Sequence, residues 1–187
     1  MWNVPGTVLQ IPREEADGLE QRFSDLFLAG GMVLSQVANL TGLEAHTVQN
    51  WVKRGFLPPP EQKKYNICQL CRILNINMLR SALPLERICG LLSYINGRLD
   101  DTADDIIDDA RLYFLFVRLA ARARQLDEPG LWEQALEAAL ADYQEPVPGA
   151  RARVEKALRV MMTAWVSARM RQLAEEQLND MEKEKLL

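Results

Sequence analysis

The chain has 187 residues, of which 48% are hydrophobic and 26% charged, an ordinary balance for a globular protein with its own core. No stretch approaches the roughly 20 apolar residues of a membrane-spanning helix, and the N-terminus lacks the basic start and apolar core of a signal peptide. The 3 cysteines, an odd number, argue against a disulfide framework. We therefore expect a cytoplasmic protein with no membrane partner.

Residues 1 to 31 are expected to form an N-terminal arm and a helix. Pro5, Gly6 and Pro12 predict an extended arm over residues 1 to 15, because proline and glycine interrupt regular structure. A helix is expected from about residue 16 to 29, before Gly30-Gly31. Its apolar side carries Leu19, Phe23, Leu26 and Phe27.

The next segment, residues 34 to 55, has the pattern of two short helices joined by a tight turn. Apolar residues in the first helix recur at spacings of three and four, and Ser35 is placed to cap it. Thr41-Gly42 ends this helix, since glycine adopts the left-handed conformation that other residues resist. The second helix is expected from about Glu44 and stops at Gly55.

Projected at about 100° per residue, the second helix separates into two faces. One is mostly apolar and should pack on a core: Glu44, Ala45, Val48, Trp51 and Val52. The opposite arc is rich in amides and cations: His46, Thr47, Gln49, Asn50, Lys53 and Arg54. Amides pair with adenine in the major groove, while lysine and arginine neutralise phosphate, so this arc predicts a helix that reads DNA.

A short basic wing is expected after the second helix. Lys63, Lys64 and Tyr65 would place two cations and an aromatic ring against the flanking DNA backbone. Two further helices are expected, from residue 67 to 80 and from Pro84 to Gly97. The chain as a whole carries −4, yet residues 32 to 98 hold 8 basic and 3 acidic groups, net +5. Positive charge is therefore concentrated in the expected DNA-binding domain, residues 32 to 97.

This stretch resembles the MerR family of winged helix-turn-helix regulators. The resemblance lies in Thr41-Gly42, Thr47-Val48-Gln49-Asn50-Trp51 and Gly55-Phe56-Leu57-Pro58-Pro59, and it continues in Tyr65 and Leu85-Glu86-Arg87-Ile88. It implies a regulator that binds double-stranded DNA and dimerises through a long C-terminal helix. The family's recognition-helix arginine is Gln49 here and the wing is shorter, which implies altered base or phosphate contacts.

A closer resemblance is to an uncharacterised bacterial family, domain of unknown function 1836. It rests on the motifs QNWVKRG, KKY, LLSYING and DDIIDD and covers roughly residues 25 to 115. This resemblance implies a transcriptional regulator without naming its target.

Residues 98 to 187 are expected to form a separate helical layer for dimerisation or effector response. Helices are expected over residues 101 to 126, 131 to 142 and 151 to 184, separated by proline- and glycine-containing breaks. The expected fold is therefore all-α, a MerR-like winged helix-turn-helix domain followed by a helical region with a long last helix.

An aspartate-rich group opens the first of these helices. Its six carboxylates would cover about half of a helix, with Ala103, Ile106, Ile107 and Ala110 opposite. We interpret it as a solvated first turn favoured by the helix dipole, or as a partner for Arg98 or Arg111. A hard cation such as Mg²⁺ is the alternative ligand. The group consists of Asp100, Asp101, Asp104, Asp105, Asp108 and Asp109.

Cys68 and Cys71 have the spacing of a redox or zinc pair, with Cys89 on the next helix. A structural zinc site needs a fourth ligand, and the single histidine, His46, points outward in the projection. We therefore interpret the cysteines as core packing, with metal or redox sensing as the alternative.

The last helix carries Val154, Leu158, Met161, Trp165 and Ala168 at alternating spacings of four and three. This pattern is typical of a coiled coil over about two heptads. It favours a homodimer, because two half-sites usually need two readers, although a monomeric core helix has the same pattern.

The sequence contains none of the nucleophile triads, phosphate loops or dinucleotide fingerprints that would indicate an enzyme, and no cofactor is expected. Our functional interpretation is a DNA-binding transcriptional regulator. A protein-interaction module using the same face and, less favoured, a small metal-dependent protein using the aspartates are the alternatives. His46, Gln49 and Asn50 are expected at base edges, with Thr47 on the same arc. The expected phosphate contacts are Lys53, Arg54, Lys63, Lys64 and Tyr65.

Overall fold

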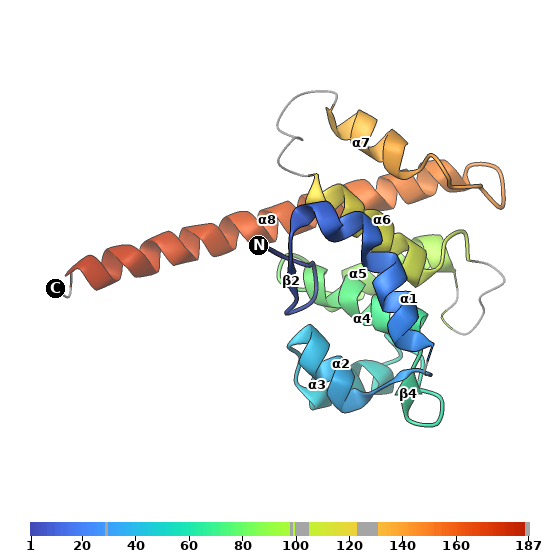
Figure 1. Ribbon diagram of the computed structural model, residues 1–187, viewed down its shortest axis with the longest axis horizontal. Helices are drawn as coiled ribbons and strands as arrows, with labels where there is room; N and C mark the ends of the chain where they lie inside the picture. The colour runs from blue at the N-terminus through green and yellow to red at the C-terminus, as the bar shows by residue number, and fades with distance from the viewer. Residues whose placement is uncertain (29, 98, 100–104, 123–130, 186–187) are drawn as a thin grey trace.

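A computed structural model describes residues 1–28, 30–97, 99, 105–122 and 131–185. The described chain is mostly helical, as predicted, with only two-residue strands (Figure 1). Its helices are α1 (Leu19–Phe27), α2 (Leu34–Thr41), α3 (Ala45–Lys53), α4 (Ile67–Leu79), α5 (Leu85–Asn96), α6 (Asp109–Ala121), α7 (Leu131–Ala139), α8 (Ala150–Lys185) and the 3-10 helix η1 (Arg13–Gly18). The strands are β1 (Trp2–Asn3), β2 (Gln10–Ile11), β3 (Met32–Val33) and β4 (Lys64–Tyr65).

The N-terminal segment packs against later helices of the chain, so the prediction of an extended arm is wrong. Strands β1 and β2 pair antiparallel, with Trp2 opposite Ile11. The side chains of Trp2 and Val4 are buried, whereas that of Asn3 between them is exposed. The hydroxyl of Tyr113 on α6 donates a hydrogen bond to the carbonyl oxygen of Pro5 at 2.8 Å. The apolar side chains of this short segment thus anchor it to the later helices.

The predicted pair of short helices is present as α2 and α3. The cap of α2 differs from the prediction: Val33 is the N-cap, and its backbone N–H donates to the side-chain oxygen of Gln36 at 3.0 Å. Gly42 ends α2 in the left-handed conformation, with φ of 69°, as predicted. Helix α3 follows after three residues and ends before Gly55.

Helix α4 is the centre of the fold. Its apolar residues Leu70, Ile73, Leu74 and Met78 are buried, and so are the polar residues Gln69, Arg72 and Asn75. Burial on several sides follows from the helices that contact α4, which are α1, α2, α5, α6 and α8. One hydrophobic core continues from Trp2 to Ala164. The region after residue 98 is therefore not the separate layer that we expected, and the three-part division stays a prediction about function.

In the described part of the aspartate-rich segment, Asp108 is exposed at the start of a helix, as predicted, whereas Asp109 is not solvated. Asp108 is the N-cap of α6, and its carboxylate accepts a hydrogen bond from the backbone N–H of Arg111 at 2.8 Å. Asp109 is largely buried and pairs with Arg72 of α4 at 3.2 Å. Burial raises the pKa of Asp109, while the guanidinium of Arg72 acts in the opposite direction. Asp100, Asp101 and Asp104 lie outside the described residues.

Helix α8 has two parts with different environments. Val154, Leu158 and Met161 are buried against the protein's own core, and the ring of Trp165 lies edge-on to Phe116 at 6.0 Å. These residues, whose heptad spacing favoured a homodimer, therefore pack against other helices of the same chain. Beyond them α8 leaves the body as a single projecting helix (Figure 1). None of the helices that the structure describes combines enough length and apolarity to cross a membrane.

Candidate nucleic-acid interface

Helix α3 presents its polar arc to solvent, as the sequence predicted. Val48 and Trp51 are buried beneath it, with 0% and 5% of their surfaces exposed. His46, Gln49, Asn50, Lys53 and Arg54 are exposed, whereas Thr47 is half-buried. The buried indole and valine fix the rotation of α3 about its own axis, because turning the helix would expose them. The amide side chains are therefore held on the outer face by the core.

Arg54 differs from its neighbours because it already has partners within the chain. Its guanidinium forms an ion pair with Glu86 of α5 at 2.6 Å and lies over the ring of Phe56 at 4.6 Å. Both members of the ion pair are more than half exposed, so the pair contributes little to stability. A phosphate at this position would compete with the carboxylate of Glu86. Arg54 is therefore a weaker candidate contact than Lys53.

The wing strand β4 forms a small antiparallel sheet with β3, a strand that was not expected. Strand β3, directly before α2, pairs with β4 so that Met32 lies opposite Tyr65 and Val33 opposite Lys64. A Cβ atom on Gly31 would lie 2.4 Å from the carbonyl oxygen of Tyr65, so only glycine allows this close approach. The sequence showed no alternating pattern at residues 32–33, because a two-residue strand is too short to have one.

The side chains of the wing divide between surface and core. Lys63 and Lys64 are exposed, but Tyr65 is buried, with 3% of its surface exposed, and burial raises the pKa of its hydroxyl. This arrangement disfavours the predicted phosphate contact by Tyr65 and suits a role in supporting the wing. Gln62 and Lys63 have positive φ values of 47° and 64°, which is uncommon for residues with a Cβ atom. The tight turn thus holds Lys63 at the tip of the wing at some conformational cost.

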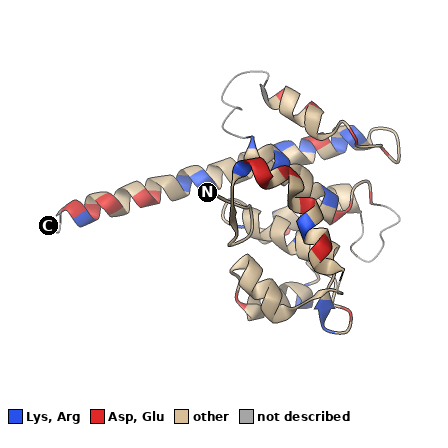
Figure 2. Ribbon diagram, viewed as in Figure 1, with Lys and Arg blue, Asp and Glu red and all other residues tan. Residues whose placement is uncertain are grey.

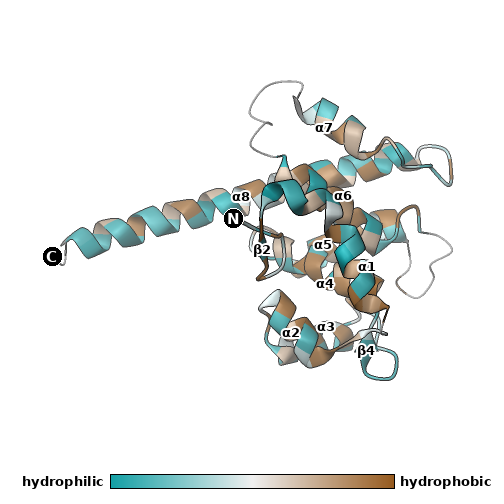
Figure 3. Cartoon of the chain, in the orientation of Figure 1, coloured by the Kyte–Doolittle hydropathy of each residue, from teal (hydrophilic) through white to brown (hydrophobic). Residues whose placement is uncertain are grey.

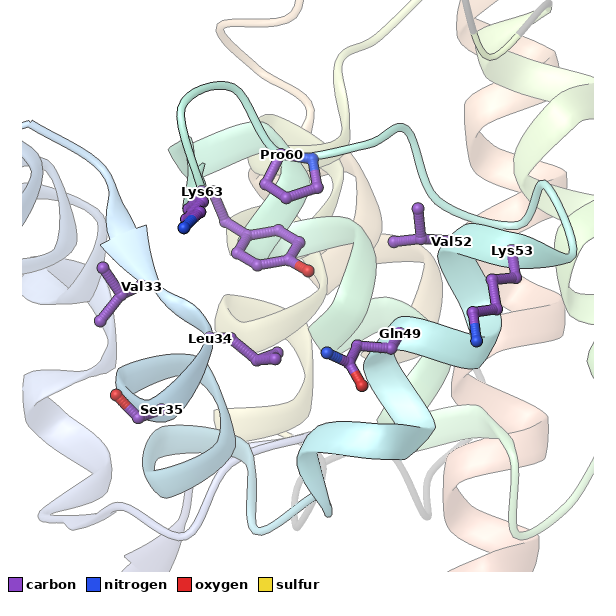
Figure 4. Close-up of a pocket in the computed structure, with 9 residues that line it drawn as sticks. Val33, Leu34, Ser35, Gln49, Val52, Lys53, Pro60 and Lys63 are labelled. Carbon is purple, nitrogen blue, oxygen red and sulfur yellow. The ribbon is translucent and has the colours of Figure 1, made fainter.

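A groove of about 670 Å³ lies between the start of α2, the outer face of α3 and the wing (Figure 4). Val33, Leu34 and Val52 supply apolar surface, while Gln49 and Lys53 come from α3 and Lys63 from the wing. The amide of Gln49 points across the groove toward Leu34 (Figure 4). The groove brings together the polar arc and the basic wing, which are separated in sequence. Val33, Leu34 and Pro60 were not predicted as part of this surface.

The charges of this region fit a polyanionic ligand. Lys53, Lys63 and Lys64 are all exposed. Figure 2 shows the basic tip of the wing beside β4 and the mixed charges elsewhere. The wing tip also carries one acidic residue, Glu61, which forms a backbone bridge with Lys64. The surface is therefore modestly basic, consistent with the local charge of the sequence.

The cysteines occupy separate environments and are free thiols. Cys71 is buried in the core, as predicted, and burial raises its pKa well above the usual value. Burial together with the nearby carboxylate of Asp108 raises the pKa of Cys68 to about 11. A protonated thiol is a poor metal ligand and nucleophile. Among the residues that the structure describes, no cluster of histidine, cysteine, aspartate or glutamate is arranged to hold a metal ion.

Comparison with known proteins finds a similarity to a domain family but no activity. Residues 28–116 match the model of a "Domain of unknown function (DUF1836)", close to the extent that we predicted. An "Uncharacterized protein YkrK" of Bacillus subtilis (strain 168) is 29% identical over 108 residues, which are 56% of this chain and 46% of that protein. The chain thus spans less than half of that relative. No solved structure matches.

The matched region ends within a helix that packs against the centre of the fold. The match ends inside α6, the helix that packs against α4, and so crosses the boundary expected at residue 97. The region similar to this domain family therefore includes the start of the C-terminal half. The MerR resemblance finds no support in these comparisons and stays a prediction.

Proposed function

We propose that the protein is a DNA-binding transcriptional regulator that reads the major groove with α3 and the flanking backbone with its wing. The observation that carries this proposal is the fixed orientation of α3. Trp51 and Val48 are buried, while Gln49, Asn50 and Lys53 are exposed on the same short helix. Residues of a helix that is held rigidly can match the donor and acceptor pattern of base edges.

Each exposed residue has a role that follows from its chemistry. Gln49 and Asn50 pair with base edges through their amides, and His46 lies on the same arc. Phosphates on the two sides of the DNA major groove are bound by Lys53, Lys63 and Lys64. Thr47 is half-buried and Arg54 is paired with Glu86, so both contribute less. Tyr65 supports the wing from within rather than touching DNA.

We also propose that the projecting part of α8 pairs with a second copy of the chain. Every side chain from Arg169 to Glu184 is exposed. Met170, Leu173, Leu178 and Met181 are 46% to 60% exposed, and the helical repeat places them on one broad side of the helix. Figure 3 shows the projecting part of α8 as mostly hydrophilic, with a few hydrophobic positions along it. An isolated helix of this length is only marginally stable in water, so burial of these residues in a partner would stabilise it.

The charges of the projecting helix favour an antiparallel pair. Its first part carries Arg169 and Arg171 without acidic residues, whereas residues 175 to 185 hold five acidic and two basic residues. Figure 2 shows this change along α8. Antiparallel pairing places the arginines of one copy beside the carboxylates of the other. A dimer of this kind would carry two readers for two half-sites.

The decisive experiment selects genomic fragments with the purified full chain and then measures affinity for a selected site by fluorescence anisotropy. Changing Lys63→Ala and Lys64→Ala together should weaken binding and lower the slope of log affinity against log salt by about two units, one per lost phosphate contact. Lys156→Ala with Arg159→Ala on the packed part of α8 is the matched control, because it removes the same charge far from α3 and the wing and outside the proposed dimer contact. If both double variants lower affinity and slope equally, the wing does not bind phosphate.

A specific observation also favours the rival interpretation as a protein-interaction module. The groove beside α3 is largely lined by apolar side chains, which would also accept a peptide. Such a module would select no DNA fragment even at low salt, where non-specific binding is strongest. It would instead bind a defined protein partner, and Gln49→Ala with Val52→Asp would abolish that binding. The DNA proposal assigns no catalytic step or cofactor and places the chain in the cytoplasm.

A further inference from the structure

The groove beside α3 contains apolar surface that contacts with base amides and phosphates would leave unused. Val52 is half-buried and lines this groove, whereas Val48 and Trp51 on the inner face of α3 are 0% and 5% exposed. Leu34, the first residue of α2, is also half-buried and lines the same groove. Part of each of these two side chains is therefore open to whatever occupies the groove.

This apolar surface lies beside an amide and a cation on the same helix. Val52 and Lys53 follow Gln49 by three and four residues, so both are its neighbours on the surface of α3. Figure 4 shows the amide of Gln49 directed toward Leu34 across the groove. One turn of α3 thus presents an amide, a small apolar surface and a positive charge, which suit three different groups of a ligand.

The charges of the groove favour a polyanion as its occupant. Lys53 and Lys63 lie at opposite ends of the groove, with Gln49 and Leu34 between them (Figure 4). Among the described residues, none that lines the groove is acidic. Duplex DNA has the same order of groups, because the edges and methyl groups of its bases lie in the major groove between two phosphate backbones. The apolar surface is therefore placed where a base presents its apolar group.

We propose that Val52 and Leu34 bind the 5-methyl group of a thymine, so that the protein selects sites with a thymine beside the base that Gln49 contacts. Thymine is the base that carries a methyl group in the major groove, and adenine presents the donor and acceptor that an amide side chain pairs with. Cytosine at the same position would leave the apolar surface without a partner. This inference rests on the proposed function, because it names the base that the DNA-binding surface selects.

Replacing thymine by uracil tests the inference, since uracil lacks only the methyl group and keeps the same base pairing. Each thymine of a genomic fragment selected by the full chain is replaced in turn, and affinity is measured by fluorescence anisotropy. At one or more positions the affinity should fall about fourfold, the effect of one buried methyl group. Replacement of thymines in the flanks of the selected site should leave affinity unchanged.

Protein variants then connect this effect to the groove. For Val52→Ala, the ratio of the affinities for the thymine and uracil sites should fall toward one, because the surface that contacts the methyl group is reduced. A loss of folding would lower both affinities equally and leave the ratio unaffected. Leu34→Ala provides the same measurement on the second side chain. Val160→Ala on α8 is the matched control, since it shortens a valine that is 45% exposed and lies outside the groove, and it should keep the full ratio.

The inference is overturned if the selected fragments lack thymine, or if no uracil replacement weakens binding. It is also overturned if the ratio is unchanged in both Val52→Ala and Leu34→Ala. In these cases the chain still selects DNA, so the proposed function stands without the thymine contact. A chain that selects no DNA and instead binds a peptide in this groove would refute the proposed function and the inference together.

Discussion

Changing Asp109 to asparagine would leave the guanidinium of Arg72 buried without a carboxylate partner. The side chains of Arg72 and Asp109 are 5% and 13% exposed, and their ion pair joins α4 to α6 at 3.2 Å. Removing one member of a buried pair typically destabilises a protein by about 3–5 kcal/mol, because the other charge stays in a poorly solvated site. We therefore expect Asp109→Asn to lower the free energy of unfolding by at least about 3 kcal/mol.

Urea unfolding followed by tryptophan fluorescence measures this loss, since Trp51 and Trp165 both contact the core. Glu86→Gln provides a matched control, because it breaks an arginine–carboxylate pair whose side chains are 55% and 64% exposed. That change should alter the free energy of unfolding by less than about 1 kcal/mol. Equal losses in the two variants would refute the reasoning, because the difference in burial would then have no energetic effect. Replacing Arg72 and Asp109 together with leucine should restore much of the stability.

Three other predictions follow from the same structure. Lys63→Gly should raise the free energy of unfolding by about 0.5–1 kcal/mol, because glycine adopts positive φ without strain. The same change should weaken DNA binding in anisotropy titrations, because it removes a cation. A lower free energy of unfolding would contradict the turn geometry. Leu173→Glu with Leu178→Glu should convert a dimer into monomers in sedimentation experiments, and an unchanged mass would exclude this helix as the interface. Alkylation of Cys68 by iodoacetamide should rise with a midpoint near its pKa of about 11 instead of 9.0. Since the folded chain holds that proton after the unfolded chain has lost it, stability should fall as pH rises between these values.

Helices α2 and α3 could be predicted because the signals for where they begin and end are local. Gly42 and Gly55 end α2 and α3 where expected, and the two faces of α3 follow from the helical repeat. The outward arc could be predicted because amides and cations, which are costly to bury, lie opposite the tryptophan on the same helix. Short motifs also predicted where the chain resembles the domain family of unknown function, and the family model matches residues 28–116.

The candidate interface was only partly predictable. Lys63 and Lys64 are exposed as expected, but Tyr65 is buried because its strand pairs with residues 32–33, far enough away to leave no local signal. An aromatic residue in a short strand has the same appearance in sequence whether it faces solvent or a core. The groove beside α3 likewise depends on the wing approaching the start of α2.

The sequence by itself determined which residues of each helix share a face, where the short helices end and where positive charge is concentrated, because these properties depend on neighbours within a few positions. Only the tertiary structure decided what each face packs against. It placed Trp2 in the core and paired Asp109 with a residue 37 positions earlier. It also buried the first part of α8 against the chain's own core. A periodic pattern records that a surface is buried, but the identity of its partner is set by long-range packing.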